Sequence, residues 1–466
     1  MTGNILERPS WANNNKPVTS PTLSLSPRRS SLSLSFILLF FFLYVFQVFF
    51  GLCESQWWER DEIQTYLIGL KCYTTQTWPY FGPDVNGAEN ESFQSQMPGA
   101  LEGLLIGLPF YFCPIPEAPF LLLGFLNTLG AAFLSWYIHR RLPSLSRSWL
   151  MLWICVTPWV LQKCAHIINP AYDFLPSVLF FIGFLECLPK FRMNLLKPFW
   201  SNAAMGFGIF WIMQFHFSYI YFLPLAAYAL YAQAREHRGG PALLGFACGA
   251  LPMAALILPT WLQYGFSPSH VASGFAVPFC WQNVLSLPVI LARFLSLVCF
   301  EIPRYLGDDL TMRIKFLTDR PWILVPGAIL WIGGLAQAFI LFIAGFKRKH
   351  PDPLWAKTRN LTLACFLLVY LSFWFTVKLP LSHIYLVFYP LLMLYSCYVW
   401  SFLAGKGKAR IWFRVFVLLG LYFQIGYAIV KEPTNSMYKH DRAKVVQALA
   451  QKDYRIFQER RPGTLY

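Results

Sequence analysis

Apolar stretches of about 20 residues recur through most of this 466-residue chain and constrain its fold more than any other feature. A helix of roughly 20 residues crosses a hydrocarbon layer about 30 Å thick. Hydrophobic residues make up 56% of the sequence and charged residues only 13%, a far more apolar balance than that of a soluble domain. Because backbone groups inside lipid must satisfy one another, the stretches predict an all-α polytopic membrane protein.

The first apolar segment, residues 34–52, is predicted to be an uncleaved anchor rather than a secretory signal. Its apolar run exceeds the roughly 7 to 15 residues of a signal h-region, and residues 50–53 lack the small side chains that cleavage needs. Residues 1–31 are rich in Ser, Pro and Asn and include Arg28 and Arg29, which predicts a disordered cytoplasmic tail.

Ten further spans complete a predicted transmembrane domain of about 11 helices over residues 32–430. They lie near 118–138, 148–163, 174–188, 199–214, 218–233, 241–262, 321–345, 360–377, 384–404 and 411–430. With the N-terminus inside, the basic short loops all fall on the cytoplasmic side, as the positive-inside rule requires. These loops carry Arg140, Arg141, Arg147, Lys190, Arg192, Lys197, Arg235, Arg238, Lys347, Arg348, Lys349, Lys406, Lys408 and Arg410.

The same map puts almost all acidic residues on the outer side. Residues 98–115 and 283–302 are apolar but interrupted by Pro or charged residues, so they are predicted to be helices in the outer interface. Residues 431–466 are predicted to form a short basic extracytoplasmic tail with one small helix around 441–459. The net charge of +16 then reflects cytoplasmic loops and this tail, and no nucleic-acid motif accompanies it.

The 11 cysteines show no CxxC pair and no Cys/His spacing suited to zinc. One disulfide is possible among the cysteines predicted on the outer side, which are Cys53, Cys72, Cys113, Cys164 and Cys280. No motif requires a cofactor, and a divalent metal at an outer carboxylate also stays open.

Asp61 and Glu62 lie in the first long outer loop, on a predicted amphipathic juxtamembrane helix over residues 57–70. Trp58, Glu62 and Tyr66 share one face of that helix, because they are four residues apart. A carboxylate at the membrane surface can accept a proton from a hydroxyl or hold a metal against a phosphate. The alternative is a solvated acidic pair, since Asp and Glu are ordinary surface residues.

The second outer loop brings a base, an imidazole and a carboxylate to the mouth of two helices through Lys163, His166 and Asp173. Asn169-Pro170 favours a turn there, and Asp173 is placed to cap the next helix. Capping explains Asp173 as well as catalysis does. A charged residue at a membrane boundary is nevertheless a candidate functional residue.

The segment 378–386 sets Lys378, His383 and Tyr385 at the outer end of a late span. Cationic groups in this position can bind a phosphate. The alternative is a snorkelling lysine beside an interface tyrosine. His216, in the tight turn 213–217, is interpreted as a hydrogen-bonded interface residue rather than a ligand.

The order of these features resembles the GT-C superfamily of membrane glycosyltransferases. Within it the chain is similar to the family 39 group, which includes protein O-mannosyltransferases and the bacterial aminoarabinose transferase of lipid A. The resemblance covers residues 32–405 and rests on residues 61–62, 97–101, 137–142, 169–173, 383–385 and 389–390. Two positions depart from the group: Gln96-Met97 replaces the usual Lys before Pro98, and His383 stands where Arg is common.

The resemblance implies that Asp61 is the general base or the main acceptor-side carboxylate, with Glu62 and Asp173 in support. It implies an inverting transfer of a hexosyl or pentosyl group from a polyprenyl-phosphate donor on the outer side of the membrane. The acceptor, whether lipid, glycan or protein, stays open. Membrane lipids are expected partners and nucleic acid is not. The short loops favour a bacterial inner membrane with an extracytoplasmic site, and a location in the endoplasmic reticulum stays open.

Two other classes remain open. A transporter or flippase for a lipid-linked sugar would bury charges within its spans. An O-antigen ligase or polymerase would use the large late loop over residues 263–320, which contains His270, Arg293, Arg304 and Arg313.

Overall fold

The computed structural model describes residues 34–54, 60–84, 96–265, 279–307, 309–347, 352, 354–376, 381–404, 407–431 and 436–458. About 82% of it is helical, which confirms the all-α prediction. The predicted cytoplasmic tail, residues 1–31, lies outside the described residues.

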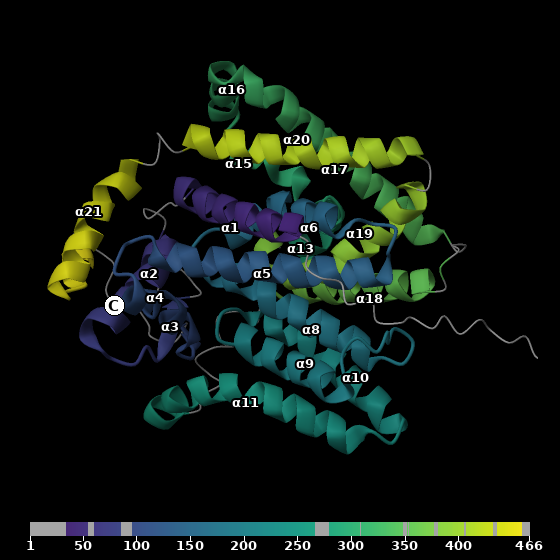
Figure 1. Ribbon diagram of the computed structural model, residues 1–466, viewed down its shortest axis with the longest axis horizontal. Helices are drawn as coiled ribbons and strands as arrows, with labels where there is room; N and C mark the ends of the chain where they lie inside the picture. Colours follow the sequence, from purple (N-terminus) through teal and green to yellow (C-terminus); the bar gives the residue numbers. More distant parts are fainter. Residues whose placement is uncertain are drawn as a thin grey trace, which may run out of the picture.

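Each predicted span corresponds to a helical segment within the described residues (Figure 1). In chain order these are α1 (Leu34–Glu54), α5 (Ala118–Arg141), α6 (Arg147–Val156) with α7 (Pro158–Cys164), α8 (Phe174–Cys187), α9 (Pro198–Ile212), α10 (Phe222–Arg235), α11 (Gly239–Tyr264), α17 (Pro321–Phe346), α18 (Leu354–Phe373), α19 (Tyr389–Ala404) and α20 (Gly407–Lys431).

Seven helices in the described residues are long and apolar enough to cross a membrane, as an integral membrane protein requires. They cover residues 34–54, 118–141, 169–187, 239–264, 321–346, 382–403 and 410–431. The predicted number of 11 spans is therefore confirmed only in part. The segment expected at 148–163 is divided between α6 and α7 at Thr157, because Pro158 cannot donate the hydrogen bond that would continue α6.

Shorter elements lie between the long helices. They are α2 (Arg60–Thr75), β1 (Phe81–Asp84), β2 (Gln96–Pro98), α3 (Leu101–Gly107), α4 (Pro109–Phe112), α13 (Trp281–Leu285), α14 (Leu287–Leu295), α15 (Ile302–Tyr305), α16 (Leu310–Asp319), α21 (Ser436–Gln451) and α22 (Arg455–Gln458). The 3-10 helices of the described residues join them: η2 (Asn169–Asp173), η3 (Phe217–Tyr221), η4 (Cys299–Glu301) and η5 (Ser382–Phe388). Residues 98–115 and 283–302 thus form short pieces rather than single long helices.

Small residues let α9 pack closely between α8 and α11 (Figure 1). A Cβ at Gly206 would collide with the carbonyl oxygen of Phe246, and one at Gly249 would collide with that of Ala203. Close backbone approach of this kind is typical of helix pairs in membranes, where van der Waals packing replaces the hydrophobic effect.

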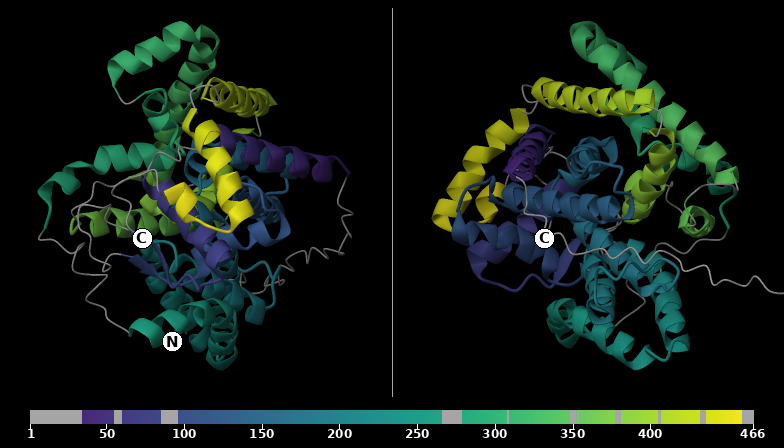
Figure 2. Two further views of the ribbon diagram at one scale, coloured as in Figure 1. Left: turned by 90° about the vertical axis from the view of Figure 1, so that its left-hand side faces the viewer. Right: turned by 45° about the vertical axis from the view of Figure 1, so that its right-hand side comes forward.

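One end of the bundle gathers α2, α3 and the antiparallel pair β1–β2; we call it the α2 end. The register of the pair sets Phe81 opposite Pro98. Helix α21, near the C-terminus, lies beside α2 at this end (Figures 1 and 2) and contacts it. Its buried residues Val445, Ala448 and Leu449 share an apolar cluster with α2 and α3. The C-terminal segment and the first loop therefore lie at the same end.

Candidate active site

Three turns that are far apart in the sequence meet at the α2 end. The 3-10 helices η2 and η3 both contact η5. Each one leads directly into a long helix, so the three turns bring the predicted site segments 163–174, 213–217 and 381–386 together. Lys378 lies outside the described residues, and its proposed phosphate contact stays a prediction.

Glu62 and His166 form the central pair of the site. Glu62 Oε1 lies 2.9 Å from His166 Nδ1, and the side chains are 2% and 12% exposed. Sequence reasoning singled out both residues but did not pair them, since 104 positions separate them. A carboxylate bound to one ring nitrogen fixes the imidazole orientation and prepares it for proton transfer.

The helix that carries Glu62 also carries Asp61. Both residues lie in the first turn of α2 as the structure describes it, and the predicted start of this helix at residue 57 lies outside the described residues. The side chain of Asp61 lies outside the described part of the structure. Its backbone position nevertheless puts Asp61 next to the Glu62–His166 pair.

A glycine allows this pair to form. A Cβ at Gly51 would collide with the carbonyl oxygen of Ala165, the residue before His166. The end of α1 therefore lies directly against the second outer loop. Only a residue without a side chain permits that approach.

Glu54, one turn after Gly51, adds a carboxyl group that sequence reasoning missed. It is 4% exposed and accepts a hydrogen bond from the Tyr427 hydroxyl at 3.2 Å. Lys431 and His166 are near enough to stabilise its negative charge, and Glu62 is near enough to oppose it. An acid at the end of an otherwise uncharged span was the available sequence signal.

Asp173 lies deeper, beside Glu102 of α3. The two residues are 1% and 0% exposed, and their charges interact. Neither carboxyl oxygen of Asp173 has a hydrogen-bond partner within the described residues, although the Ser218 hydroxyl is close by. Two buried carboxylates repel each other, so ionising both side chains at once is unfavourable.

The structure does not support helix capping as the role of Asp173. Asp173 does precede α8, but its backbone is helical and its side chain makes no capping hydrogen bond. The 3-10 helix η2 runs straight into α8 at this point. The alternative explanation raised by the sequence is therefore removed, and Asp173 remains a candidate functional residue.

A second polar network joins η5 to the loop that follows α11. The Ser382 hydroxyl donates to Glu301 Oε2 at 3.0 Å, and the Tyr305 hydroxyl donates to the same oxygen at 3.3 Å. Arg293 Nε lies 2.6 Å from Glu301 Oε1. Burial, and next the charge of Glu301, raise the pKa of Tyr305 well above its usual value, so its hydroxyl stays a donor.

The two networks are connected through Tyr305. The Tyr427 hydroxyl that donates to Glu54 also lies 2.8 Å from the Tyr305 carbonyl oxygen. Lys163 lies over the Tyr305 ring, 5.9 Å from its centre. Lys163 is thus at the site, and a lysine close to buried carboxylates offers a positive charge for an anionic ligand.

The remaining predicted residues come from η5. The His383 ring is 6.0 Å from the His216 ring, edge to face. Tyr385 is fully buried and packs against Trp159 with 5.7 Å between ring centres. This burial favours a role for Tyr385 in positioning η5, whereas His383 is half-buried at the junction of η3 and η5.

All 11 cysteines are free thiols, so the disulfide left open by the sequence does not form in this structure. Within the described residues, no group of three or more His, Cys, Asp or Glu side chains is arranged to hold a metal ion.

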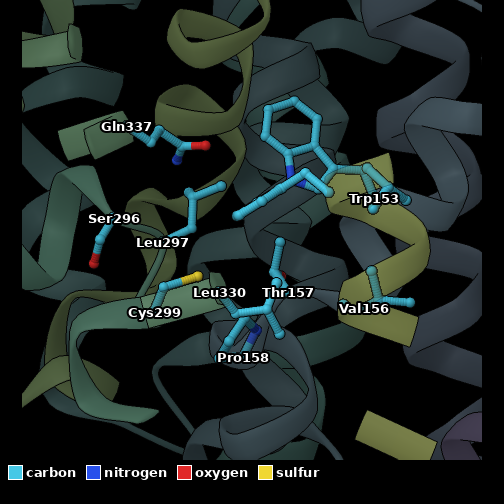
Figure 3. A pocket seen from close by; sticks show the side chains of 12 residues that line it. Trp153, Val156, Thr157, Pro158, Ser296, Leu297, Cys299, Leu330 and Gln337 are labelled. Atoms are coloured by element: carbon cyan, nitrogen blue, oxygen red, sulfur yellow. The ribbon is translucent and has the colours of Figure 1, made fainter. Parts of the chain in front are cut away.

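A narrow cavity elsewhere in the bundle does not belong to this site. It lies at the break between α6 and α7 and has a volume of about 20 Å³, enough for one water molecule. Figure 3 shows Thr157, Cys299 and Gln337 around it. The Thr157 hydroxyl and the Gln337 amide bond to carbonyl oxygens at 3.0 and 3.2 Å, so they need no ligand.

The chain matches no protein-family model, no curated protein and no solved structure.

Proposed function

We propose that this protein is a glycosyltransferase that moves a hexosyl or pentosyl group from a polyprenyl-phosphate donor to an acceptor hydroxyl. The observation that carries the proposal is the pairing of Glu62 with His166 beside Asp61, at the end of the bundle that also holds Asp173. Buried acids beside an imidazole are suited to proton transfer. Their place at the ends of membrane-spanning helices suits a lipid-linked donor.

In the proposed reaction Asp61 accepts the proton of the acceptor hydroxyl. The acceptor oxygen attacks the anomeric carbon, the bond from that carbon to the phosphate oxygen breaks, and polyprenyl phosphate leaves with the electron pair. Glu62 and His166 hold the first turn of α2 in place and stabilise the charge near Asp61. His383 is the proposed contact for the donor phosphate, with Lys163 as a second positive group.

We further propose that the α2 end faces outward from a bacterial inner membrane, with the N-terminus in the cytoplasm. The basic loops between long helices support this orientation, because positive residues favour the cytoplasmic side. The remaining long helical segments, α6 with α7, α9, α10 and α18, would then complete 11 spans.

Lipid-linked sugar transport is the second candidate, and the burial of Glu54 within α1 favours it. An ionisable residue inside a span is typical of a substrate or proton pathway. The Arg293–Glu301 pair of the late loop similarly favours a ligase or polymerase.

Transfer of labelled sugar from a panel of polyprenyl-phosphate donors tests the proposal. Membranes containing the wild-type protein should form product, and Asp61→Asn should lose roughly 100-fold or more in rate, as expected when a general base is removed. Asp319→Asn, a change at an exposed position on α16, is the matched control and should retain full activity.

Transport of the donor across vesicles without product formation would instead support the second candidate. Full activity in Asp61→Asn would remove Asp61 from the reaction.

A further inference from the structure

A basic crevice opens at the end of the bundle opposite the candidate active site. It has a volume of about 340 Å³, within the range of small-ligand sites. It lies between two parts of the chain: the turn between α5 and α6 with the start of α6, and the facing residues of α19 and α20. Its lining consists of Pro143, Ser144, Leu145, Ser146, Trp149, Trp153, Trp400, Ser401, Arg410, Phe413 and Arg414.

Arg410 and Arg414 give the crevice its charge. They are four residues apart on α20 and so share one face of that helix. The lining includes no acidic side chain, and neither arginine forms an ion pair within the described residues. Two positive charges therefore face the crevice without neutralisation, which favours an anionic ligand.

The other lining groups define the chemistry of that ligand. Arg414 lies over the Trp149 ring, 5.4 Å from its centre, so its guanidinium is held against the crevice wall. The hydroxyl groups of Ser144 and Ser146 supply hydrogen-bond donors around the same space, whereas the Ser401 hydroxyl donates to the Tyr398 carbonyl oxygen at 2.8 Å. A phosphate suits this arrangement, because it offers several oxygens to arginine and hydroxyl donors together.

The surroundings of the crevice point to a lipid. Beside Arg410 on α20, Ile411 and Trp412 are 63% and 70% exposed. An exposed tryptophan next to arginines is typical of the level where acyl chains meet head groups. Snorkelling alone would place arginines at this level, but it would not surround them with an aromatic and hydroxyl-lined hollow.

We propose that the crevice binds the phosphate head group of an anionic phospholipid, with its acyl chains along the apolar face of α20. Basic pockets between membrane helices bind anionic head groups in this manner. The proposal is independent of the reaction at the α2 end, because the crevice shares no residue with that site.

Binding of fluorescent phosphatidylglycerol to the full-length protein in phosphatidylcholine nanodiscs tests the proposal. The double variant Arg410→Gln, Arg414→Gln should bind roughly 30-fold more weakly than wild type, from the usual contribution of two arginines near an anionic lipid. Arg235→Gln is the matched control, because Arg235 is also near an aromatic ring, that of Tyr231, but lies outside the crevice. It should bind as wild type does.

Ser401→Phe fills the hollow without changing charge and should also weaken binding. Since the arginines are exposed, thermal unfolding of the double variant should match wild type. Equal binding by wild type and the double variant would overturn the proposal, as would an equal loss in Arg235→Gln. Displacement of the lipid by millimolar inorganic phosphate would assign the site to a soluble phosphate and overturn the lipid assignment.

Discussion

The two ends of α8 hold buried acids in opposite situations. Asp173, before the first residue of α8, has no hydrogen-bond partner for its carboxyl oxygens within the described residues. Glu186, in the last turn, accepts from the Tyr137 hydroxyl at 3.2 Å and from the Leu195 amide at 3.0 Å. It also pairs with Arg141 at 3.4 Å, and both side chains of that pair are at most 1% exposed.

This comparison teaches that burial of an acid is not by itself a sign of function. Glu186 is a structural residue, because its charge is neutralised and its oxygens are hydrogen-bonded. Asp173 lies buried near Glu102, the charges of the two residues interact, and no cation is paired with Asp173 within the described residues. An arrangement that is unfavourable on its own is typical of a site that acts on a ligand.

Glu186→Ala should have the largest effect. It leaves Arg141 buried without its carboxylate, which costs about 3–5 kcal/mol of unfolding free energy. Chemical or thermal unfolding in detergent measures this loss. Glu236→Ala is the matched control. The Glu236 side chain is 31% exposed and pairs with Arg192, so its loss should cost at most about 1 kcal/mol of unfolding free energy. Equal losses in both variants would contradict the structural role of Glu186.

Glu62→Gln should affect activity more than stability. Loss of the carboxylate beside His166 should reduce sugar transfer roughly 100-fold, equivalent to about 2.7 kcal/mol in the barrier. Transfer assays at equal protein level measure the loss, and Glu236→Gln serves as control. If Glu62→Gln is less stable but transfers sugar at the wild-type rate per folded molecule, Glu62 has a structural role like that of Glu186 and no role in the reaction.

Gly51→Ala should have an intermediate effect on both the free energy of unfolding and the rate of sugar transfer. The added methyl collides with the Ala165 carbonyl oxygen, and relieving that overpacking costs about 1–3 kcal/mol. Because Ala165 precedes His166, transfer should fall together with stability. Gly240→Ala is the control, since a Cβ at Gly240 meets no atom within 4 Å. Similar behaviour of the two variants would show that α1 does not position His166.

Tyr305→Phe should have the smallest effect, about 1 kcal/mol of stability, because one hydrogen bond to Glu301 is lost. The folded-state pKa of Tyr305 is raised above its unfolded value near 10, so the stability difference should be constant below about pH 9. It should shrink as pH rises through the unfolded pKa toward the folded one. Unfolding measured at pH 7 and pH 10.5 checks this direction.

The sequence predicted the long helices because apolar length and flanking charge are local signals. Helix α11 was expected at 241–262 and lies at Gly239–Tyr264, and α17 was expected at 321–345 and lies at Pro321–Phe346. Some helix bounds differ from the prediction, because the length of an apolar stretch does not determine where a helix breaks or begins. Pro158 divides one predicted span, and α18 starts at Leu354, six residues earlier than predicted.

The site was predictable as a set of residues but not as a set of contacts. Glu62, His166 and Asp173 were each notable from their place at the mouth of a span, since charges are rare there. That Glu62 pairs with His166, and that Asp173 lies near Glu102, depends on packing between segments far apart in the chain. Glu54 and Glu301 were missed because a single acid in an apolar segment gives no indication of its partner.

The most direct test of the account is to make the same conservative change at the two ends of α8, as Asp173→Asn and Glu186→Gln, and to measure unfolding and sugar transfer for both. We expect Asp173→Asn to remain within about 1 kcal/mol of wild-type stability, or to exceed it, while transfer collapses. Glu186→Gln should be clearly less stable yet transfer normally per folded molecule. The reverse pattern, an active Asp173→Asn and a folded but inactive Glu186→Gln, would contradict the assignment of chemistry to the α2 end.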